Sequence, residues 1–260
     1  MRSGYIIRRN RGGTLYLTEF DDPKLAGTWS EDEEIAWFAS TGLHAQEKDD
    51  ALFLLYKRID RGVDRWIQDA RYIPRLLISA LSFLVVYFFF SLAIRDPLPM
   101  IDELFIASAA AVITAMGLAR RDKKGDVAMK QRLVLKQQAS RSDFIIEEGI
   151  ASYEDYLDEC SHLDTIDLAE RLTLTTSESL PSLVIPEGRT GPWQEQFNNL
   201  LLRSIELTHK QLFTRYRQII RVRNSEQGDE SLAARLVKFS MQGQIDLPLL
   251  ALLVEVEKQK

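Results

Sequence analysis

The sequence contains few of the residues from which metal and redox sites are built. It has one cysteine, Cys160, and three histidines among 260 residues. A lone cysteine cannot form an intrachain disulfide, so the soluble parts need no oxidising compartment. Zinc usually takes four Cys or His ligands, or three plus water, and His44 and His209 have no paired spacing with other ligands. We therefore expect neither a metal site nor a cofactor.

Catalytic motifs are also scarce. Cys160 and His162 lie two residues apart in "DECSHLD", where helical side chains diverge by about 200° and cannot form a nucleophile pair. The glycine segments "RGG" and "EGRTG" match neither the GxxxxGK[ST] nor the GxGxxG phosphate loop. No catalytic residue is assigned, and we expect a protein without enzymatic activity.

An excess of positive charge is missing as well. The chain has 33 Lys plus Arg against 38 Asp plus Glu, a net charge of -5, whereas nucleic-acid binders are usually basic. The segment "LPLLALLVEVE" follows a helix and a turn, but it is apolar almost all round, unlike a DNA-reading helix. We expect no nucleic-acid partner. The first residues lack the apolar core of a cleavable secretory signal.

Two long apolar runs dominate what is present. Residues 76–94 carry no charge, and a helix of that length spans about 28 Å, close to the thickness of a hydrocarbon core. Thirteen of these residues are Leu, Ile, Val or Phe, which favour insertion by roughly 4 to 8 kcal/mol. The second run, 98–119, is weaker because residues 104–119 include six alanines. It spans the membrane if its carboxylates lie in the outer interface.

Three alanines at four-residue spacing, Ala107, Ala111 and Ala115, predict close packing of the second span on the first. The alternative is that alanine only fills a helix at these positions. Both interpretations keep the two runs as a transmembrane hairpin over residues 75–119.

Basic residues flank the hairpin on both sides. Six precede it within residues 57–75 and seven follow it within 120–136, whereas the connecting segment has only Arg95. The positive-inside rule places both termini in the cytoplasm, at the inner membrane if the cell is bacterial. The residues expected at the lipid headgroups are Arg71, Arg75, Arg120, Arg121, Lys123 and Lys124.

The N-terminal module, residues 1–48, is predicted to hold two strands around a Gly-Gly turn. A short helix is expected from a Ser30 to Glu33 capping box to about Gly42. Residues 49–74 form an amphipathic juxtamembrane helix that turns into the bilayer at Pro74. Its apolar face lies on the anionic leaflet or packs on the protein itself, and the sequence leaves both open.

The charged segment, residues 120–180, changes sign abruptly. Residues 143–170 contain ten acidic residues and no Lys or Arg. They are expected to pair with a basic helix of about residues 193–222, or to bind another protein. The C-terminal domain, 181–260, is helical, with that long helix, a second one, a turn at Gly243, a cap at Asp246 and a last helix near Pro248.

The fold class expected is a mainly α membrane protein. It combines a two-helix transmembrane hairpin, a short β-hairpin/α N-terminal module and a helical C-terminal cytoplasmic domain. The function expected is that of a membrane-anchored interaction or scaffold protein. Its expected partners are membrane lipid and either another protein or a further copy of the same chain. The alternatives are an oligomeric two-span pore or membrane effector, and an enzyme with an unrecognised site around residues 155–167.

Overall fold

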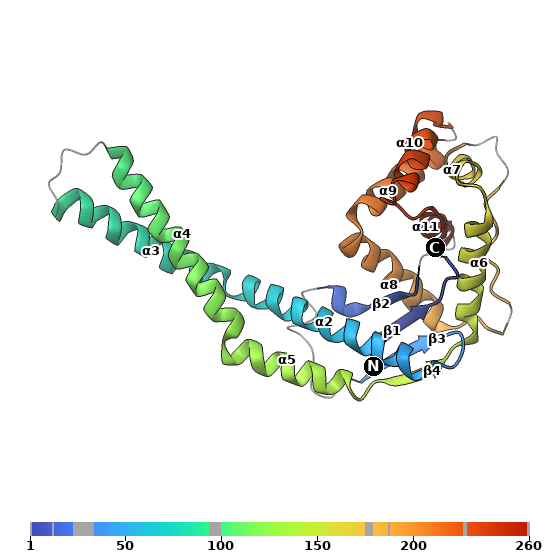
Figure 1. The fold of residues 1–260 in the computed structure, drawn as a ribbon, viewed down its shortest axis with the longest axis horizontal. Helices are drawn as coiled ribbons and strands as arrows, with labels where there is room; N and C mark the ends of the chain where they lie inside the picture. Colours follow the sequence, from blue (N-terminus) through green and yellow to red (C-terminus); the bar gives the residue numbers. More distant parts are fainter. Residues whose placement is uncertain are drawn as a thin grey trace. The chain divides into compact units, whose positions relative to one another are not determined.

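The computed structural model describes residues 2–11, 13–22, 34–93, 100–174, 179–186, 188–225 and 228–258. The protein is mainly helical and has one small sheet (Figure 1). Its strands are β1 (Arg2–Ile7), β2 (Leu15–Thr18), β3 (Ile35–Ala39) and β4 (Asp143–Ile146). Its α-helices are α2 (Ala45–Ala70), α3 (Tyr72–Phe88), α4 (Met100–Lys124), α5 (Asp126–Ala139), α6 (Ala151–His162), α7 (Thr165–Thr173), α8 (Pro192–Thr208), α9 (Lys210–Asn224), α10 (Glu230–Met241) and α11 (Leu247–Lys258). A π-helical turn, η2 (Phe89–Ala93), continues α3, and short 3-10 turns are η1 (Glu19–Asp21) and η3 (Glu148–Ile150).

The four strands form one mixed sheet in the order β2-β1-β3-β4. Strands β1 and β2 pair antiparallel, which confirms the predicted N-terminal hairpin. The helix predicted to end near Gly42 is wrong over Ile35–Ala39, because that segment is strand β3. Its "IAWFA" is apolar throughout and aromatic in the middle, a composition that favours a buried strand. The capping box itself, Ser30 to Glu33, lies outside the described residues.

Strands β3 and β4 are adjacent and parallel, from Ala36 opposite Asp143 to Ala39 opposite Ile146. Parallel neighbours cannot be joined by a tight turn and need a crossover connection. Here the crossover contains α2, α3, α4 and α5, so both apolar runs lie within it. The residues before the hairpin and those after it therefore share one sheet.

The chain divides into two compact units. The first comprises the described residues of 1–22, 33–55 and 139–260, and the second includes residues 56–138. The core of the first unit joins Tyr5 and Ile7 of β1 to the helices of the C-terminal region. The N-terminal strands and the C-terminal helices thus bury apolar surface together, although they are far apart in the sequence.

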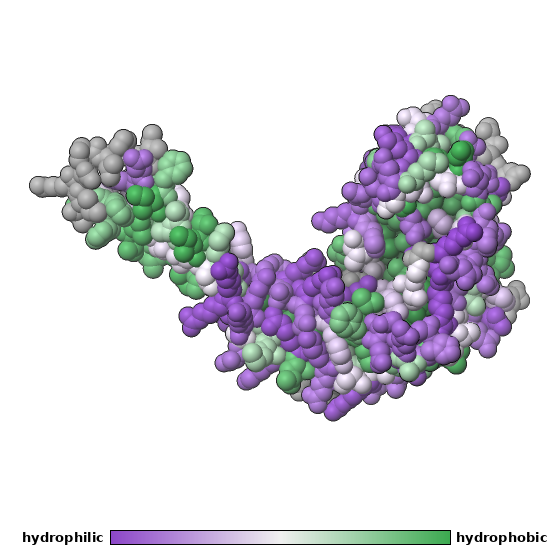
Figure 2. All heavy atoms as spheres, viewed as in Figure 1, coloured by the Kyte–Doolittle hydropathy of each residue, from purple (hydrophilic) through white to green (hydrophobic). Residues whose placement is uncertain are grey.

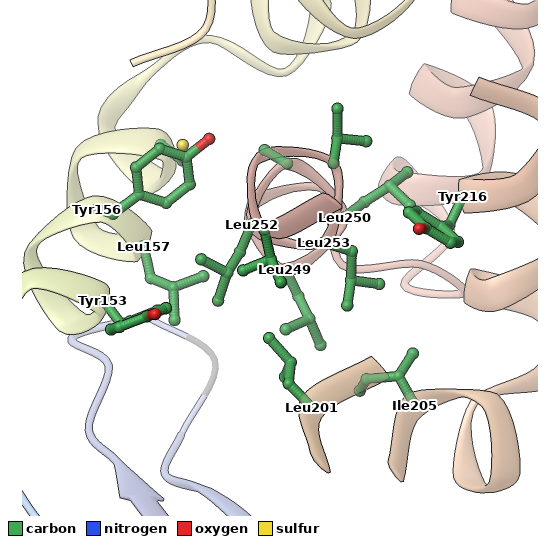
Figure 3. Close-up of a cluster of buried hydrophobic side chains, with 14 of the residues drawn as sticks. Tyr153, Tyr156, Leu157, Leu201, Ile205, Tyr216, Leu249, Leu250, Leu252 and Leu253 are labelled. Carbon is green, nitrogen blue, oxygen red and sulfur yellow. The ribbon is translucent and has the colours of Figure 1, made fainter. Parts of the chain in front are cut away.

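Helix α11 lies at the centre of this core (Figure 3). Leu250, Leu252 and Leu253 are fully buried, with side chains of α6, α8 and α9 around them. Gly243, at a φ of +66°, supplies the left-handed turn after α10. Asp246 Oδ1 then accepts the Leu249 N–H at the start of α11. These features confirm the predicted turn, the predicted cap and the apolar last helix, which is core.

The long helix predicted over about residues 193–222 is wrong, since α8 and α9 meet at a break at His209, where φ is −124° and ψ is 61°. Just before the break, the Thr208 hydroxyl donates to the Ser204 carbonyl at 2.6 Å. Such back-bonding to the preceding turn bends helices. The break lets α8 and α9 both contact α11.

Four charged residues of the acidic segment and of that basic helix have partners other than the predicted ones. Glu148 pairs with Arg189 at 3.0 Å, and the Glu154 carboxylate accepts the Arg8 backbone N–H at 2.7 Å. On the basic side, Arg203 pairs with Asp22 and Arg217 pairs with Glu206. These four residues therefore pair outside the predicted contact, and the pairing of the two segments as a whole stays a prediction.

The arginines of the N-terminal hairpin bond within the protein. Arg8 contacts Glu47 through two bonds, Nε to Oε1 at 2.8 Å and Nη2 to Oε2 at 3.1 Å. Arg9 pairs with Asp246 at 2.5 Å, and Arg11 donates to the Ser161 carbonyl at 3.2 Å. The bond from Arg8 lowers the pKa of Glu47 to about 2.

Candidate functional site: an apolar hairpin with a polar base

Helices α3 and α4 are long and apolar enough to cross a membrane, and almost nothing in the protein covers them. In the most apolar window of Tyr72–Leu92 only 6% of residues are buried, and in that of Asp102–Ala139 only 11%. Leu77 is 65% exposed and Ile113 70% exposed. The surface of the two helices is mostly hydrophobic (Figure 2). The core helix of a soluble protein would instead bury such side chains.

The two helices pack against one another along one face (Figure 1). On α4, Ala107 is buried and Ala111 and Ala115 are half-buried, and their place on this face stays a prediction. Alanine has the shortest side chain after glycine, so it lets two helix backbones approach.

A hydrogen bond joins the two helices. The hydroxyls of Ser82 and Thr114 lie 3.0 Å apart, and the Thr114 hydroxyl donates to the Ala110 carbonyl at 2.8 Å. A hydroxyl has a single proton to donate, so Ser82 is the donor between the two. The pair fixes the register of α3 on α4 with polar groups turned toward each other.

At the base of the hairpin α2 gives way to α3 at Arg71, where φ is −101° and ψ is 7°. The turn was predicted at Pro74, three residues later than the observed break. The proline ring clashes with the carbonyl four residues earlier, at Ala70, so the helix breaks before the proline. Arg75 spans the break, because its Nη2 donates to the carbonyls of Ile67 and Gln68 at 3.0 and 2.8 Å.

Arg75 also joins the two arms of the hairpin, since its Nε lies 3.1 Å from Oδ2 of Asp122 on α4. Lys123, the next residue on α4, pairs with Asp64 of α2 at 3.6 Å. These two of the six predicted headgroup residues are therefore engaged in ion pairs of the protein. Arg71, Arg120, Arg121 and Lys124 are exposed.

A ladder of ion pairs continues between α2 and α5. Lys136 reaches Asp60 at 2.8 Å, and Arg132 contacts both Asp60, at 3.8 Å, and Asp64. Arg132 also donates to the Lys123 carbonyl at 2.9 Å. These basic residues were predicted only to set the topology, and their acidic partners were not predicted. The signal available was the four-residue spacing of Asp60 and Asp64, which places both on one helix face.

The apolar face of α2 is buried inside the protein. Ile59 and Val63 are fully buried and Ile67 is 3% exposed. Of the two arrangements that the sequence left open for this helix, packing on the protein is the one observed, because its apolar side chains are not available to a lipid leaflet.

Cys160 and His162 do not form a site. Cys160 is buried in the core of the first unit, and burial raises its pKa to about 12, so the thiol is protonated at neutral pH. His162 is exposed. Among the residues that the structure describes, no group of three or more His, Cys, Asp or Glu side chains could hold a metal ion.

Comparisons with known proteins found no matching family model, no matching curated protein and no matching solved structure.

Proposed function

We propose that this protein is anchored in a membrane by the α3–α4 hairpin and binds another protein chain through its cytoplasmic part. In this proposal the hairpin spans the bilayer, both termini lie in the cytoplasm, and the unit built on the sheet and on α11 carries the interaction surfaces. No chemistry is assigned to the protein.

The observation that carries the proposal is the exposure of two adjacent, antiparallel apolar helices that are each long enough to span. Exposed patches of this kind are rare on soluble monomers, and a helix pair satisfies its own backbone hydrogen bonds as a bilayer requires. The polar base supports the same placement, because charged side chains gather where α3 and α4 leave the apolar region.

The proposed orientation rests on the basic residues at that base. Arg71, Arg120, Arg121 and Lys124 are exposed at the ends of α3 and α4, where cations favour an anionic cytoplasmic leaflet. Arg75 and Lys123 contribute to the positive count, although their ion pairs reduce what they offer to lipid.

Neither alternative from the sequence has an observation of similar weight. A pore would favour polar side chains aimed away from the hairpin, whereas Ser82 and Thr114 bond to each other. An enzyme site around residues 155–167 would favour an activated nucleophile or base, whereas the Cys160 thiol is buried and protonated.

Thiol labelling in cells that express the chain tests the proposal. In a Cys160→Ala background, single cysteines replace Asp96 between the spans, Gln46 and Gln244 on the two sides of the hairpin, and Val85 within α3. With a membrane-impermeant maleimide we expect Asp96→Cys to react in intact cells. Gln46→Cys and Gln244→Cys should react only after permeabilisation.

Labelling of Val85→Cys distinguishes a hairpin inserted in the membrane from one exposed to water. Val85 is 61% exposed in the protein alone, so a cysteine there would react in a soluble protein but not beneath lipid. Labelling of Val85→Cys in native membranes, or release of the chain by alkaline carbonate, would contradict the anchor. Labelling of Gln244→Cys in intact cells would contradict the orientation.

A further inference from the structure

The first unit has a groove between α8 and α9 that nothing in the described chain fills. Its volume is about 710 Å³. The floor is apolar and consists of Leu202, Phe213, Tyr216 and Ile220. The rim is charged and includes three arginines and two glutamates, Arg203, Arg217, Arg221, Glu206 and Glu257. An apolar floor with a charged rim is the arrangement of a protein interface, where the centre excludes water and the edge selects the partner.

The rim presents positive charge on α9. Arg217 and Arg221 are four residues apart and both exposed, so like charges lie side by side on one helix face. The Arg217 guanidinium is 4.7 Å from the centre of the Phe213 ring and 3.1 Å from Glu206. Helix α9 carries five basic residues and no acidic one. Such repulsion within a helix is relieved when an acidic surface docks on it.

A matching surface lies elsewhere on the same unit, where α6 leads into α7. Asp155 and Glu159 are exposed and also four residues apart, and α6 contains no Lys or Arg. Asp164 then caps α7, and Ile166 follows in its first turn with 51% of its side chain exposed. An exposed isoleucine that follows two exposed carboxylates along the chain is complementary to the groove in both polarity and charge.

We propose that the α6–α7 corner of a second copy of this chain occupies the α8–α9 groove. Ile166 of one copy contacts the apolar floor around Phe213 and Ile220 of the next. Asp155 and Glu159 face Arg217 and Arg221, since each pair is separated by about 6 Å along its helix. This inference rests on the proposed function and specifies its protein partner as the chain itself.

The contact joins two different surfaces, the corner of one copy and the groove of another. A pair of copies therefore still has one free groove and one free corner. Such a contact is heterologous, and its repetition produces a ring or an open chain of copies. Because two of its contacts are between exposed charges, the association weakens as salt concentration rises.

Charge reversal in the full-length protein, purified in density-matched detergent, tests the contact by sedimentation velocity. Asp155→Lys/Glu159→Lys and Arg217→Glu/Arg221→Glu should each weaken self-association by at least about tenfold, because like charges then face each other. An equimolar mixture of the two variants should restore association, since every corner again meets a groove of opposite sign. All four changes in one chain should restore it as well.

Matched controls separate this contact from general effects of charge. Asp49→Lys/Asp50→Lys and Lys238→Glu change exposed residues outside both surfaces and should leave association unchanged. Ile166→Ala tests the apolar part and should weaken association without changing charge. Thermal midpoints establish that each variant is folded, and Arg221→Glu alone replaces the double variant if loss of the Arg217 pair with Glu206 unfolds it.

Folded reversal variants that associate like the native chain would overturn the inference, and so would a mixture that does not recover. A native chain that is monomeric at all concentrations would also overturn it. None of these results changes the labelling pattern of the hairpin, so failure of this contact is distinguishable from failure of the proposed membrane anchor.

Discussion

Gly149 lies in the turn η3 that leads from β4 into α6, and it is buried. A Cβ atom at this position would lie 2.3 Å from the Trp193 ring and 2.6 Å from the Arg189 carbonyl oxygen. The backbone oxygen cannot rotate away as a flexible side chain would. Overpacking of this kind typically costs about 1–3 kcal/mol.

We therefore predict that Gly149→Ala lowers the free energy of unfolding by about 2 kcal/mol. Denaturant unfolding of the detergent-solubilised protein measures it. Gly42→Ala is the matched control, because a Cβ at Gly42 meets no atom within 4 Å. Equal effects of the two substitutions would show that the approach of Trp193 does not constrain this position.

Glu47 provides a second prediction for a single residue. Its pKa is lowered from 4.5 to about 2 by the bond from Arg8. A carboxylate with a depressed folded-state pKa adds stability above its unfolded pKa, and that stability is lost as pH falls toward the folded value. The contribution is therefore complete at pH 7 and declines between about pH 4.5 and 2.

Glu47→Gln should destabilise the protein by about 1–2 kcal/mol at pH 7, after allowance for partial exposure of the pair. The difference between the native chain and the variant should shrink as pH falls below about 4.5. Thermal midpoints of both proteins from pH 7 to 3 measure this, with exposed Asp49→Asn as control. A difference that does not depend on pH would mean that the Arg8 bond does not set the stability at this site.

At the scale of helices, Ser82 and Thr114 predict a coupling between α3 and α4. Hydrogen bonds between membrane helices contribute roughly 0.6 kcal/mol on average, and up to about 2. The single changes Ser82→Ala and Thr114→Val should each weaken the hairpin, and the double variant should cost less than their sum. Steric trapping or unfolding in mixed micelles measures the cycle.

The control for this cycle is Ser108→Ala, because Ser108 is exposed on α4, away from the α3 contact. It should show no coupling with Ser82→Ala. If the Ser82 and Thr114 effects are additive, the hydrogen bond does not set the register of the hairpin.

The same scale shows what sequence patterns predict well. The amphipathic stripe of α2, the cap and turn around α11 and the strands β1 and β2 follow local rules of spacing and capping, and each is observed. Strand β3 and the break at His209 do not follow such rules. "IAWFA" is short enough to fit a helix or a strand, and only its neighbours in the sheet decide. The apolar residues of α8 and α9 keep helical spacing across His209, so the spacing predicts one helix, whereas the break lets both helices contact α11.

At the scale of the whole chain, the sequence carries no local signal for the crossover between β3 and β4. Hydropathy identifies the hairpin and charge suggests its orientation, but the pairing of residues 36–39 with 143–146 is decided by contacts more than a hundred positions apart. The four-residue spacing of Asp60 and Asp64 places both on one helix face, but it does not identify Arg132 and Lys136 of α5 as their partners, 68 to 76 positions later. The number of charged residues can be read from the sequence, but which of them form ion pairs within the protein cannot.

The division into two units leads to a final prediction, which concerns Leu250. This residue is fully buried in α11, at the centre of the first unit, while the hairpin contacts of α3 lie with α4 in the second. Leu250→Ala should destabilise the first unit by roughly 2–5 kcal/mol, because a core leucine leaves a cavity when it is truncated. Val184→Ala, at a position 68% exposed, should have little effect.

Insertion of the hairpin should not depend on that core, since its stability in the proposed bilayer comes from apolar side chains that the first unit does not cover. In membrane vesicles, Leu250→Ala should speed protease cleavage within residues 139–260 and leave Val85→Cys unreactive in the same chain. If Val85→Cys became reactive, the hairpin would need the folded first unit to stay in the membrane. The two units would then be coupled through α2, which follows β3, and through the segment from α5 to β4, the two covalent connections between residues 56–138 and the sheet among the residues described.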